Sequence, residues 1–306
     1  MSSQQHMGFK AFLLAFLVST AALGLISTGV IAITGLFSRP DFSEQSVAGE
    51  LQYQPVSEDN ITILLMCCED DTKSPYSYTL LRFYPEGRVI RLVPLPKELE
   101  ATVNIKTGTL LELYEYGGVQ MVCDGVENVF FIEVDRYLKC NEAALSDFID
   151  QIGGIEYEVE RTVEFQKQGS EEKSRLVKGV QLLGGKKVID YFYSPLVTEL
   201  SGEKQLEKRA EFLKIGLEQR FSEGILSRTD ELFGFLTNSM QTNLTNYDYT
   251  IRKEAIRLMG RIETQKVVCL EVEGNYYTEK KGKVTFQPTE AGKSTVQAWF
   301  EPMEES

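Results

Sequence analysis

The hydrophobic pattern of the chain begins with one long uncharged segment. Between Lys10 and Arg39 lie 28 residues without a charged side chain. A helix rises about 1.5 Å per residue and a bilayer core is about 30 Å thick, so roughly 20 apolar residues are enough to cross it. We therefore predict a transmembrane anchor over 11–37, preceded by a cytoplasmic tail, 1–10. A cleaved signal peptide is the alternative, with Val30-Ile31-Ala32 as its cleavage site.

Charges on the two sides of this segment predict its orientation. Lys10 and the amino terminus precede it, whereas Arg39, Asp41 and Glu44 follow it. Because positive charge is favoured on the cytoplasmic side, we predict a single-pass protein of the cell membrane with a cytoplasmic N-terminus and an extracellular domain. The polar stretch that follows, 38–59, has little hydrophobic pattern and is predicted to be a stalk.

From residue 60 onward, strand-like and helical patterns alternate. Predicted strands are continuous or alternating apolar runs, at 61–68, 78–84, 88–93, 129–134, 155–159, 266–273, 283–287 and 295–300. Predicted helices carry apolar residues at helical spacing, at 119–128, 143–152, 184–193, 203–221, 229–240 and 247–261. The charged segment 164–178 is predicted to be an exposed hairpin. This order indicates a three-layer α/β/α domain around a central mixed sheet over 60–306, with its closing strands within 266–300.

Charge and composition restrict the chemistry and the partners. From residue 39 onward there are 31 Lys and Arg (32 minus Lys10) against 45 Asp and Glu, a formal charge of −14. Nucleic acid repels such an acidic domain at long range, so we predict no nucleic-acid partner. The single histidine, His6, precedes the uncharged segment. The domain therefore cannot use a Ser-His-Asp or Cys-His mechanism or form the common zinc sites.

The cysteines carry no recognisable motif. Their positions are 67, 68, 123, 140 and 269, and no two have the spacing of a metal knuckle or a redox pair. We interpret them as small buried hydrophobic residues, and one disulfide among them stays an open alternative.

Five short motifs follow one another along the predicted domain. They are Ile63–Glu69, Leu92–Glu98, Leu113–Gly118, Phe148–Ile155 and Leu183–Tyr191. In this order, behind an apolar segment, they resemble the LytR-CpsA-Psr family. The resemblance implies a membrane-tethered enzyme with an external α/β/α domain. Such an enzyme binds polyprenyl-pyrophosphate lipids and transfers the attached glycopolymer to peptidoglycan, while magnesium and a cluster of arginines hold the pyrophosphate.

The chain departs from this family at the positions where the resemblance implies metal and phosphate ligands. The metal-site aspartate of the first strand is Glu69, with Asp70 adjacent, and the second corresponds to Tyr78, a candidate ligand-binding residue. Oxygen ligands suit magnesium, although an acidic turn explains Glu69 and Asp70 equally well. The Arg-Asp pair after the proline becomes Lys97-Glu98, which is either a residual phosphate contact with a catalytic role or an exposed ion pair.

The arginines of the later helices are replaced as well. Two fall on Tyr193 and Pro195, and two on the next helix fall on Gln205 and Lys208. A guanidinium donates two parallel hydrogen bonds to phosphate oxygens, which an ammonium cannot do. Each lost contact weakens a transition state by about 2–4 kcal/mol, so we predict little or no catalysis. Tyr193, Gln205, Lys208 and the neighbouring Arg209 are candidate ligand-binding residues, unless they belong to a core or a solvated face.

Three hypotheses for the function remain open. The first is a LytR-CpsA-Psr-like envelope protein that binds a polyprenyl-linked or wall glycopolymer with little or no catalysis. The second is a magnesium-dependent phosphotransferase that attaches glycopolymer to peptidoglycan, in which Lys97 and Lys208 replace arginines and Glu69 with Asp70 holds the metal. The third is a structural or regulatory module that binds another envelope protein. The sequence leaves the question of enzyme activity open, and no cofactor is expected unless magnesium serves a retained activity.

Overall fold

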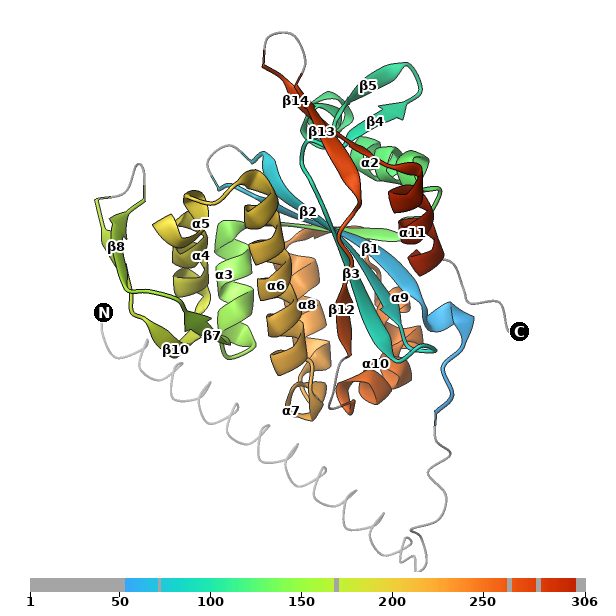
Figure 1. Ribbon diagram of the computed structural model, residues 1–306. Coiled ribbons are helices and arrows are strands. Elements are labelled where there is room, and N and C mark those ends of the chain that lie inside the picture. Colours follow the sequence, from blue (N-terminus) through green and yellow to red (C-terminus); the bar gives the residue numbers. More distant parts are fainter. Residues whose placement is uncertain (1–52, 71–72, 168–170, 263–265, 279–281, 301–306) are drawn as a thin grey trace, which may run out of the picture. The chain divides into compact units, whose positions relative to one another are not determined.

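A computed structural model describes residues 53–70, 73–167, 171–262, 266–278 and 282–300 (Figure 1). The predicted cytoplasmic tail, the predicted anchor and most of the predicted stalk lie outside these residues. The compact unit begins at Tyr53, because the last residues of the predicted stalk pack on the domain. There the hydroxyl of Tyr53 donates a hydrogen bond to the buried carboxylate of Asp59 at 2.6 Å.

None of the helices in the described ranges is long and apolar enough to cross a membrane. The longest is α2, Leu110–Phe130, whose 21 residues include four carboxylates. A charged side chain at the centre of a bilayer costs at least about 2.5 kcal/mol, so this helix is excluded as a membrane span. The predicted single-pass location in the cell membrane, with an extracellular domain, is contradicted by this finding. The predicted span itself, 11–37, lies outside the described residues.

A mixed six-stranded sheet forms the centre of the domain (Figure 1). Its strands, in spatial order, are β11 (Gln241–Thr242), β6 (Arg136–Asn141), β1 (Ile61–Cys68), β2 (Pro75–Tyr84), β3 (Val89–Leu95) and β12 (Val267–Cys269). β1 pairs with β6 in parallel and with β2 in antiparallel orientation, and β3 pairs with β12 in parallel. The predicted α/β class with a central mixed sheet is confirmed.

The other elements surround this sheet. The helices are η1 (Ser57–Asp59), α2, α3 (Glu142–Gln151), α4 (Gly185–Tyr193), α5 (Pro195–Thr198), α6 (Gly202–Arg220), α7 (Glu223–Leu226), α8 (Thr229–Ser239), α9 (Asn246–Ile251), α10 (Lys253–Gly260) and α11 (Glu290–Phe300). The remaining strands form four pairs: β4 (Glu100–Val103) with β5 (Lys106–Thr109), β7 (Ile155–Val159) with β10 (Gly179–Leu183), β8 (Val163–Gln166) with β9 (Lys173–Leu176), and β13 (Gly274–Thr278) with β14 (Val284–Pro288).

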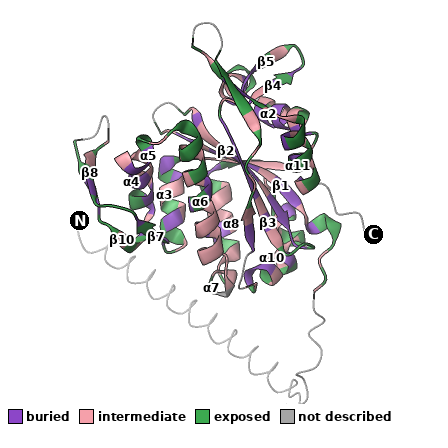
Figure 2. Ribbon diagram, in the orientation of Figure 1, coloured by how far each residue is buried: buried purple, intermediate pink, exposed green. Residues whose placement is uncertain are grey.

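Helices cover both faces of the central sheet, and buried residues concentrate along its strands (Figure 2). On one face, Leu64 and Leu80 pack against α2 and α11. On the other, Ile61 and Phe83 pack against α10, with partly buried residues of α6. β1 is continuously apolar for this reason, since alternate side chains enter two different cores.

The packed clusters on the two faces of the sheet are together called the first core, and a second core lies beside the sheet. It joins α3, α4, α5 and α6 to the strand pairs β7–β10 and β8–β9, and Tyr157, Tyr191 and Phe212 form its centre. Gly185 begins α4 because this helix touches α3: a Cβ atom there would lie 1.9 Å from the carbonyl oxygen of Ser146. α6 contributes to both cores and therefore joins them.

Most predicted elements are present, and the exceptions have local causes. The helix predicted at 119–128 begins earlier, at Leu110, because Thr109 and Glu112 form a capping box ahead of it. Gly117 and Gly118 leave helical geometry and only kink this helix. The strand predicted at 129–134 is instead the end of α2 and a loop, and the strand begins at Arg136.

The last predicted strand, 295–300, is wrong as well, because these residues belong to α11. Their apolar residues alternate over a short run, a pattern that fits either a strand or a helix. In the structure, Val296 and Phe300 lie four residues apart and bury one side of the helix against the first core. The closing strands of the domain are therefore β12, β13 and β14, and a helix follows them.

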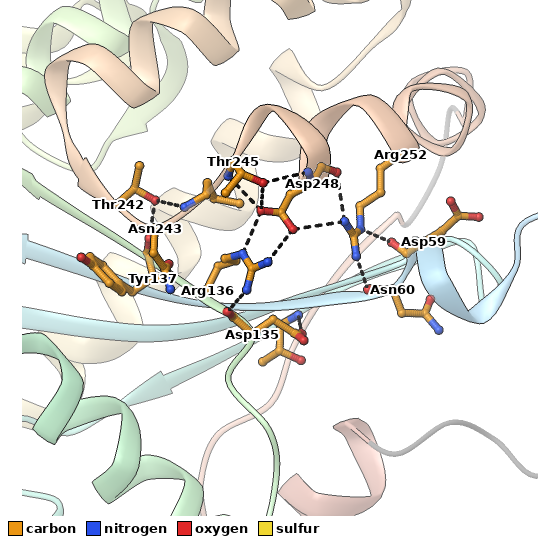
Figure 3. Close-up of polar contacts among 12 residues, drawn as sticks. Asp59, Asn60, Asp135, Arg136, Tyr137, Thr242, Asn243, Thr245, Asp248 and Arg252 are labelled. Carbon is orange, nitrogen blue, oxygen red and sulfur yellow. Dashed lines mark hydrogen bonds and ion pairs between the residues drawn. The ribbon is translucent and has the colours of Figure 1, made fainter.

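A buried carboxylate ties the short helix α9 to the sheet (Figure 3). Asp248 is 5% exposed and accepts hydrogen bonds from Nε and Nη2 of Arg136, both at 2.8 Å. Arg252 lies 3.8 Å from the same carboxylate and donates to the backbone carbonyls of Asp59 and Asn60. These contacts fix the amino end of β1 against β6 and α9.

This network predicts acid-sensitive stability. Burial raises the pKa of Asp248, but hydrogen bonds from Arg136 and Thr245 outweigh that effect and lower it from 3.8 to about 2. A depressed folded-state pKa gives stability that is present above the unfolded-state value and is lost as pH falls from about 4 to 2. We expect Asp248→Asn to reduce the free energy of unfolding at pH 7 by about 2–4 kcal/mol, because Arg136 loses its charge partner.

Urea unfolding between pH 7 and pH 2 measures both effects. Glu254→Gln, which removes an exposed carboxylate paired with Arg257, is the matched control and should keep the wild-type pH profile. A wild-type protein and an Asp248→Asn variant that lose stability equally between pH 4 and pH 2 would contradict the role given to this carboxylate.

Candidate functional site

A cluster of polar side chains lies where β1 and β6 end. The parallel register places Cys67 of β1 directly beside Cys140 of β6. The hydroxyl of Tyr76, on β2, lies 3.0 Å from the sulfur of Cys67. α6 passes over this point, and the guanidinium carbon of Arg209 lies 5.3 Å from the centre of the Tyr76 ring. The cluster therefore combines three strands of the sheet with one helix from the neighbouring layer.

Arg209 is the cation with unused hydrogen-bonding capacity in this cluster. Its Nε is buried and has no hydrogen-bond partner, and no ion pair among the described residues includes it. Burial lowers the pKa of Arg209, and the nearby Tyr76, Cys67, Tyr193 and Glu98 oppose that shift. A buried donor without an acceptor costs free energy. An oxyanion that accepts from the guanidinium would remove this cost.

A second buried charge acts on Cys67 and Tyr76, as Arg209 does, and is already neutralised. Glu142, the first residue of α3, has a side chain that is 4% exposed. Tyr193 donates its hydroxyl to Oε1 at 2.5 Å, and Nζ of Lys167 lies 2.9 Å from Oε2. Burial and the hydrogen bond to Glu142 together raise the pKa of Tyr193. Lys167 and Tyr193 are therefore committed to this carboxylate.

The two neighbouring thiols have pKa shifts in opposite directions. The hydrogen bond between them lowers the pKa of Cys67 and raises that of Cys140. Burial raises the pKa of Cys68, on the opposite face of the strand, to about 11. All five cysteines are free thiols. Their interpretation as buried residues is confirmed for Cys68 and Cys123, whereas Cys269 is exposed.

The other sequence candidates on α6, Gln205 and Lys208, are held by partners within the protein. Gln205 donates its amide to the carbonyl of Leu200 at 3.0 Å. Nζ of Lys208 lies 3.0 Å from a carboxylate oxygen of Glu160 and 3.0 Å from one of Glu211. Burial opposes the charged form of Lys208, but these hydrogen bonds raise its pKa above the usual value. Both side chains have partners within the protein.

Three further sequence candidates lie on a strand or directly after one. Tyr78 is fully buried in the first core, and its hydroxyl donates to the carbonyl of Pro75 at 3.5 Å. Lys97 and Glu98 follow β3 as an ion pair of 4.0 Å, in which the Lys97 side chain is 54% exposed. Of these three, Glu98 is the one whose charge acts on Arg209.

The proposed metal ligands lie at the carboxyl end of β1. The carboxylate of Asp70 accepts a hydrogen bond from the backbone N–H of Ala143, at the start of α3, at 3.2 Å. Glu69 closes the turn after β1 through its backbone, which pairs with Ser74 and Lys73. Within the described ranges, no group of three or more histidine, cysteine, aspartate or glutamate side chains is placed to hold a metal ion. Glu69 and Asp70 as magnesium ligands stay a prediction.

Sequence reasoning missed four members of this arrangement: Tyr76, Cys140, Glu142 and Lys167. Glu142 directly follows β6, and polar residues at strand ends are common in binding sites of α/β folds. The strand was expected at 129–134, so this signal was assigned to the wrong residues. Lys167 comes from the β8–β9 hairpin, and nothing local in the sequence relates it to Glu142.

Comparison with known proteins places this fold and these motifs in a wider group. A model of the LytR_cpsA_psr family matches residues 41–298. The polyisoprenyl-teichoic acid–peptidoglycan teichoic acid transferase TagU of Bacillus licheniformis is 25% identical over 203 residues, which are 62% of this chain and 61% of the relative. The chain thus spans about three fifths of the length of that relative.

A longer alignment with a second relative and a superposition on a solved structure agree with this family match. The corresponding transferase TagT of Bacillus subtilis is 24% identical over 280 residues, 84% of this chain and 82% of the relative. A structure described as TagT bound to LIIa-WTA superposes with a TM-score of 0.63 at 16% identity, covering 86% of this chain and 97% of that one. The superposition shows a shared fold.

The charge balance around Glu142 gives a testable prediction. Lys167→Met leaves a buried carboxylate with only Tyr193 as its partner. Because Lys167 is itself about a third exposed, we expect the free energy of unfolding to fall by about 1–3 kcal/mol at neutral pH. Lys186→Met is the matched control, since Lys186 pairs with Glu172 at the surface. Equal stability of the two variants in urea would contradict the role of Lys167.

Proposed function

The chain belongs to the LytR_cpsA_psr family, and from this premise we propose that its domain binds a glycopolymer linked to a polyprenyl (pyro)phosphate, or a wall glycopolymer, with little or no catalysis. The observation that carries the proposal is the buried guanidinium of Arg209, whose Nε has no partner. A phosphate oxygen supplies the missing acceptor. Charge-assisted hydrogen bonds of this kind are about twice as strong as neutral ones.

The electrostatics of the cluster support binding rather than bond breaking. Phosphoryl transfer depends on several cations or metal ions that stabilise charge on the transferring group. Of the cations described at this site, Lys167 is neutralised by Glu142, and Lys97 is an exposed member of an ion pair. One uncommitted guanidinium is enough to hold a phosphate, but it supplies only part of the positive field that transfer requires.

The relatives support the class of ligand. The names of TagU and TagT describe transfer of a polyisoprenyl-linked teichoic acid to peptidoglycan, and the TagT structure contains LIIa-WTA. A lipid-linked anionic glycopolymer presents a phosphate next to its isoprenoid tail. We propose that Arg209 binds this phosphate. Peptidoglycan is the second envelope polymer that we propose as a partner.

The names of the relatives favour a second candidate function, a working phosphotransferase. Unlike the binding function proposed first, a phosphotransferase must break a phosphate bond of the bound lipid headgroup. The third hypothesis, a module that binds another envelope protein, has no specific observation in its favour.

Binding of a soluble lipid pyrophosphate tests the proposal. Geranylgeranyl pyrophosphate titrated into the full chain, followed by calorimetry, should bind, and Arg209→Gln should weaken the affinity by about tenfold to a hundredfold, or about 1.5–3 kcal/mol. Arg257→Gln, which removes an exposed arginine of α10, should bind like the wild type. The affinity should also fall with rising ionic strength.

Two results would overturn parts of this assignment. If Lys208→Gln rather than Arg209→Gln abolishes binding, the ligand occupies the other side of α6. Phosphorus NMR on the same mixture with magnesium added follows release of phosphate from the lipid. Turnover by the wild-type protein would replace the binding proposal with the phosphotransferase.

A further inference from the structure

A hollow of about 330 Å³ lies at the opposite end of the central sheet from the Arg209 cluster. Its wall contains Asn60 and Thr62, at the start of β1, and Arg82, near the end of β2. The loop between α2 and β6 completes it with Phe131 and Asp135. Thr62 and Cys67 are five residues apart on one strand, about 17 Å, so the hollow is separate from the candidate phosphate site.

Two buried polar atoms in this wall have no hydrogen-bond partner. Arg82 is 8% exposed, and its Nη1 donates to the hydroxyl of Thr62 at 3.0 Å, but its Nε donates to nothing. The side-chain oxygen Oδ1 of Asn60 accepts nothing, while its amide nitrogen is held by Glu86. The wall thus contains an unused donor and an unused acceptor. A ligand that satisfies both must itself carry an acceptor and a donor.

Phe131 adds an apolar surface to this polar wall. It ends α2 in the left-handed conformation, with φ 56° and ψ 43°, and its N–H donates to the carbonyl of Glu127. Glycine is the usual residue at such a position, and a bulky side chain there is strained. The Phe131 side chain does not offset this strain by packing, because the residue is 69% exposed. A strained, exposed aromatic ring beside unsatisfied polar groups points to a bound ligand.

We propose that this hollow binds a neutral carbohydrate, with one sugar ring stacked on Phe131 and its hydroxyls bonded to Arg82 and Asn60. A hydroxyl is both a donor and an acceptor, so adjacent hydroxyls of one ring satisfy the guanidinium and the amide together. The apolar face of the ring buries the exposed aromatic surface. Glu133 and Asp135 also line the hollow, and their negative charge disfavours an anionic polymer here.

The wall is held in place before any ligand arrives (Figure 3). Arg252 donates to the backbone carbonyl of Asn60 at 3.1 Å. The carboxylate of Asp135 accepts from the backbone N–H of Thr62 at 2.7 Å, and Arg136 donates to the carbonyl of Asp135 at 2.6 Å. A preformed site loses less conformational entropy on binding than a flexible one. The proposal does not depend on the function assigned to Arg209.

The chain has a single tryptophan, Trp299, which directly precedes Phe300 of the wall and serves as a fluorescence probe. An N-acetylglucosamine tetrasaccharide and maltotetraose, each titrated into the full chain, should give a saturable change in fluorescence and a matching calorimetric isotherm for at least one sugar. Phe131→Gly should weaken that binding at least tenfold while the Tm stays equal or rises, since glycine relieves the left-handed strain. Arg82→Met should weaken it as well.

Tyr247→Ala, which removes another exposed aromatic residue on α9, is the control and should bind like the wild type. The proposal is overturned if neither sugar binds, which would mean that ordered water alone fills the hollow. It is also overturned if Phe131→Gly binds as tightly as the wild type. Equal binding of an oligomeric glycerol phosphate would rule out the preference for a neutral ligand.

Discussion

The parallel pairing of β1 with β6 is the constraint on which the rest of the structure depends. It brings two segments 73 residues apart in the sequence into one register, as in the pair Cys67 and Cys140. At the carboxyl ends it places Cys67 beside Cys140 and leads directly into Glu142. At the amino ends it brings Asp135 to the backbone of Thr62. One strand pair therefore positions both the Arg209 cluster and the hollow, at opposite ends of the same sheet.

The fold was predictable where the signal is local. The buried run at 61–68 and the helix near 143–152 each carry their own pattern, and the structure confirms them. Short apolar runs gave wrong strands at 129–134 and 295–300, because six residues fit either periodicity. In these two segments, packing against distant elements decides whether the chain avoids a strand. The spacing of apolar residues in the sequence contains no information about that packing.

The candidate site was predictable only in outline. Motif spacing placed the phosphate ligands of α6 at Gln205 and Lys208, yet the neighbouring Arg209 enters the cluster. Lys208 and Arg209 are adjacent on the helix and point about 100° apart, so an error of one residue selects a different face, whereas Gln205 lies one turn before Arg209. The burial of Phe212 helps to set that face, and its partners come from a separate strand and a separate helix. Such contacts are not visible in a single sequence.

The two cores meet at α6, and Arg209 and Glu142 lie close to this boundary. The β8–β9 hairpin belongs to the second core, and Lys167 crosses to Glu142, which follows a strand of the first. A ligand on Arg209 would touch groups from both sides. By mass action, its occupancy would oppose separation of the cores by RT ln(1 + [L]/Kd). Binding at Arg209 would thus also strengthen the cohesion between the two cores.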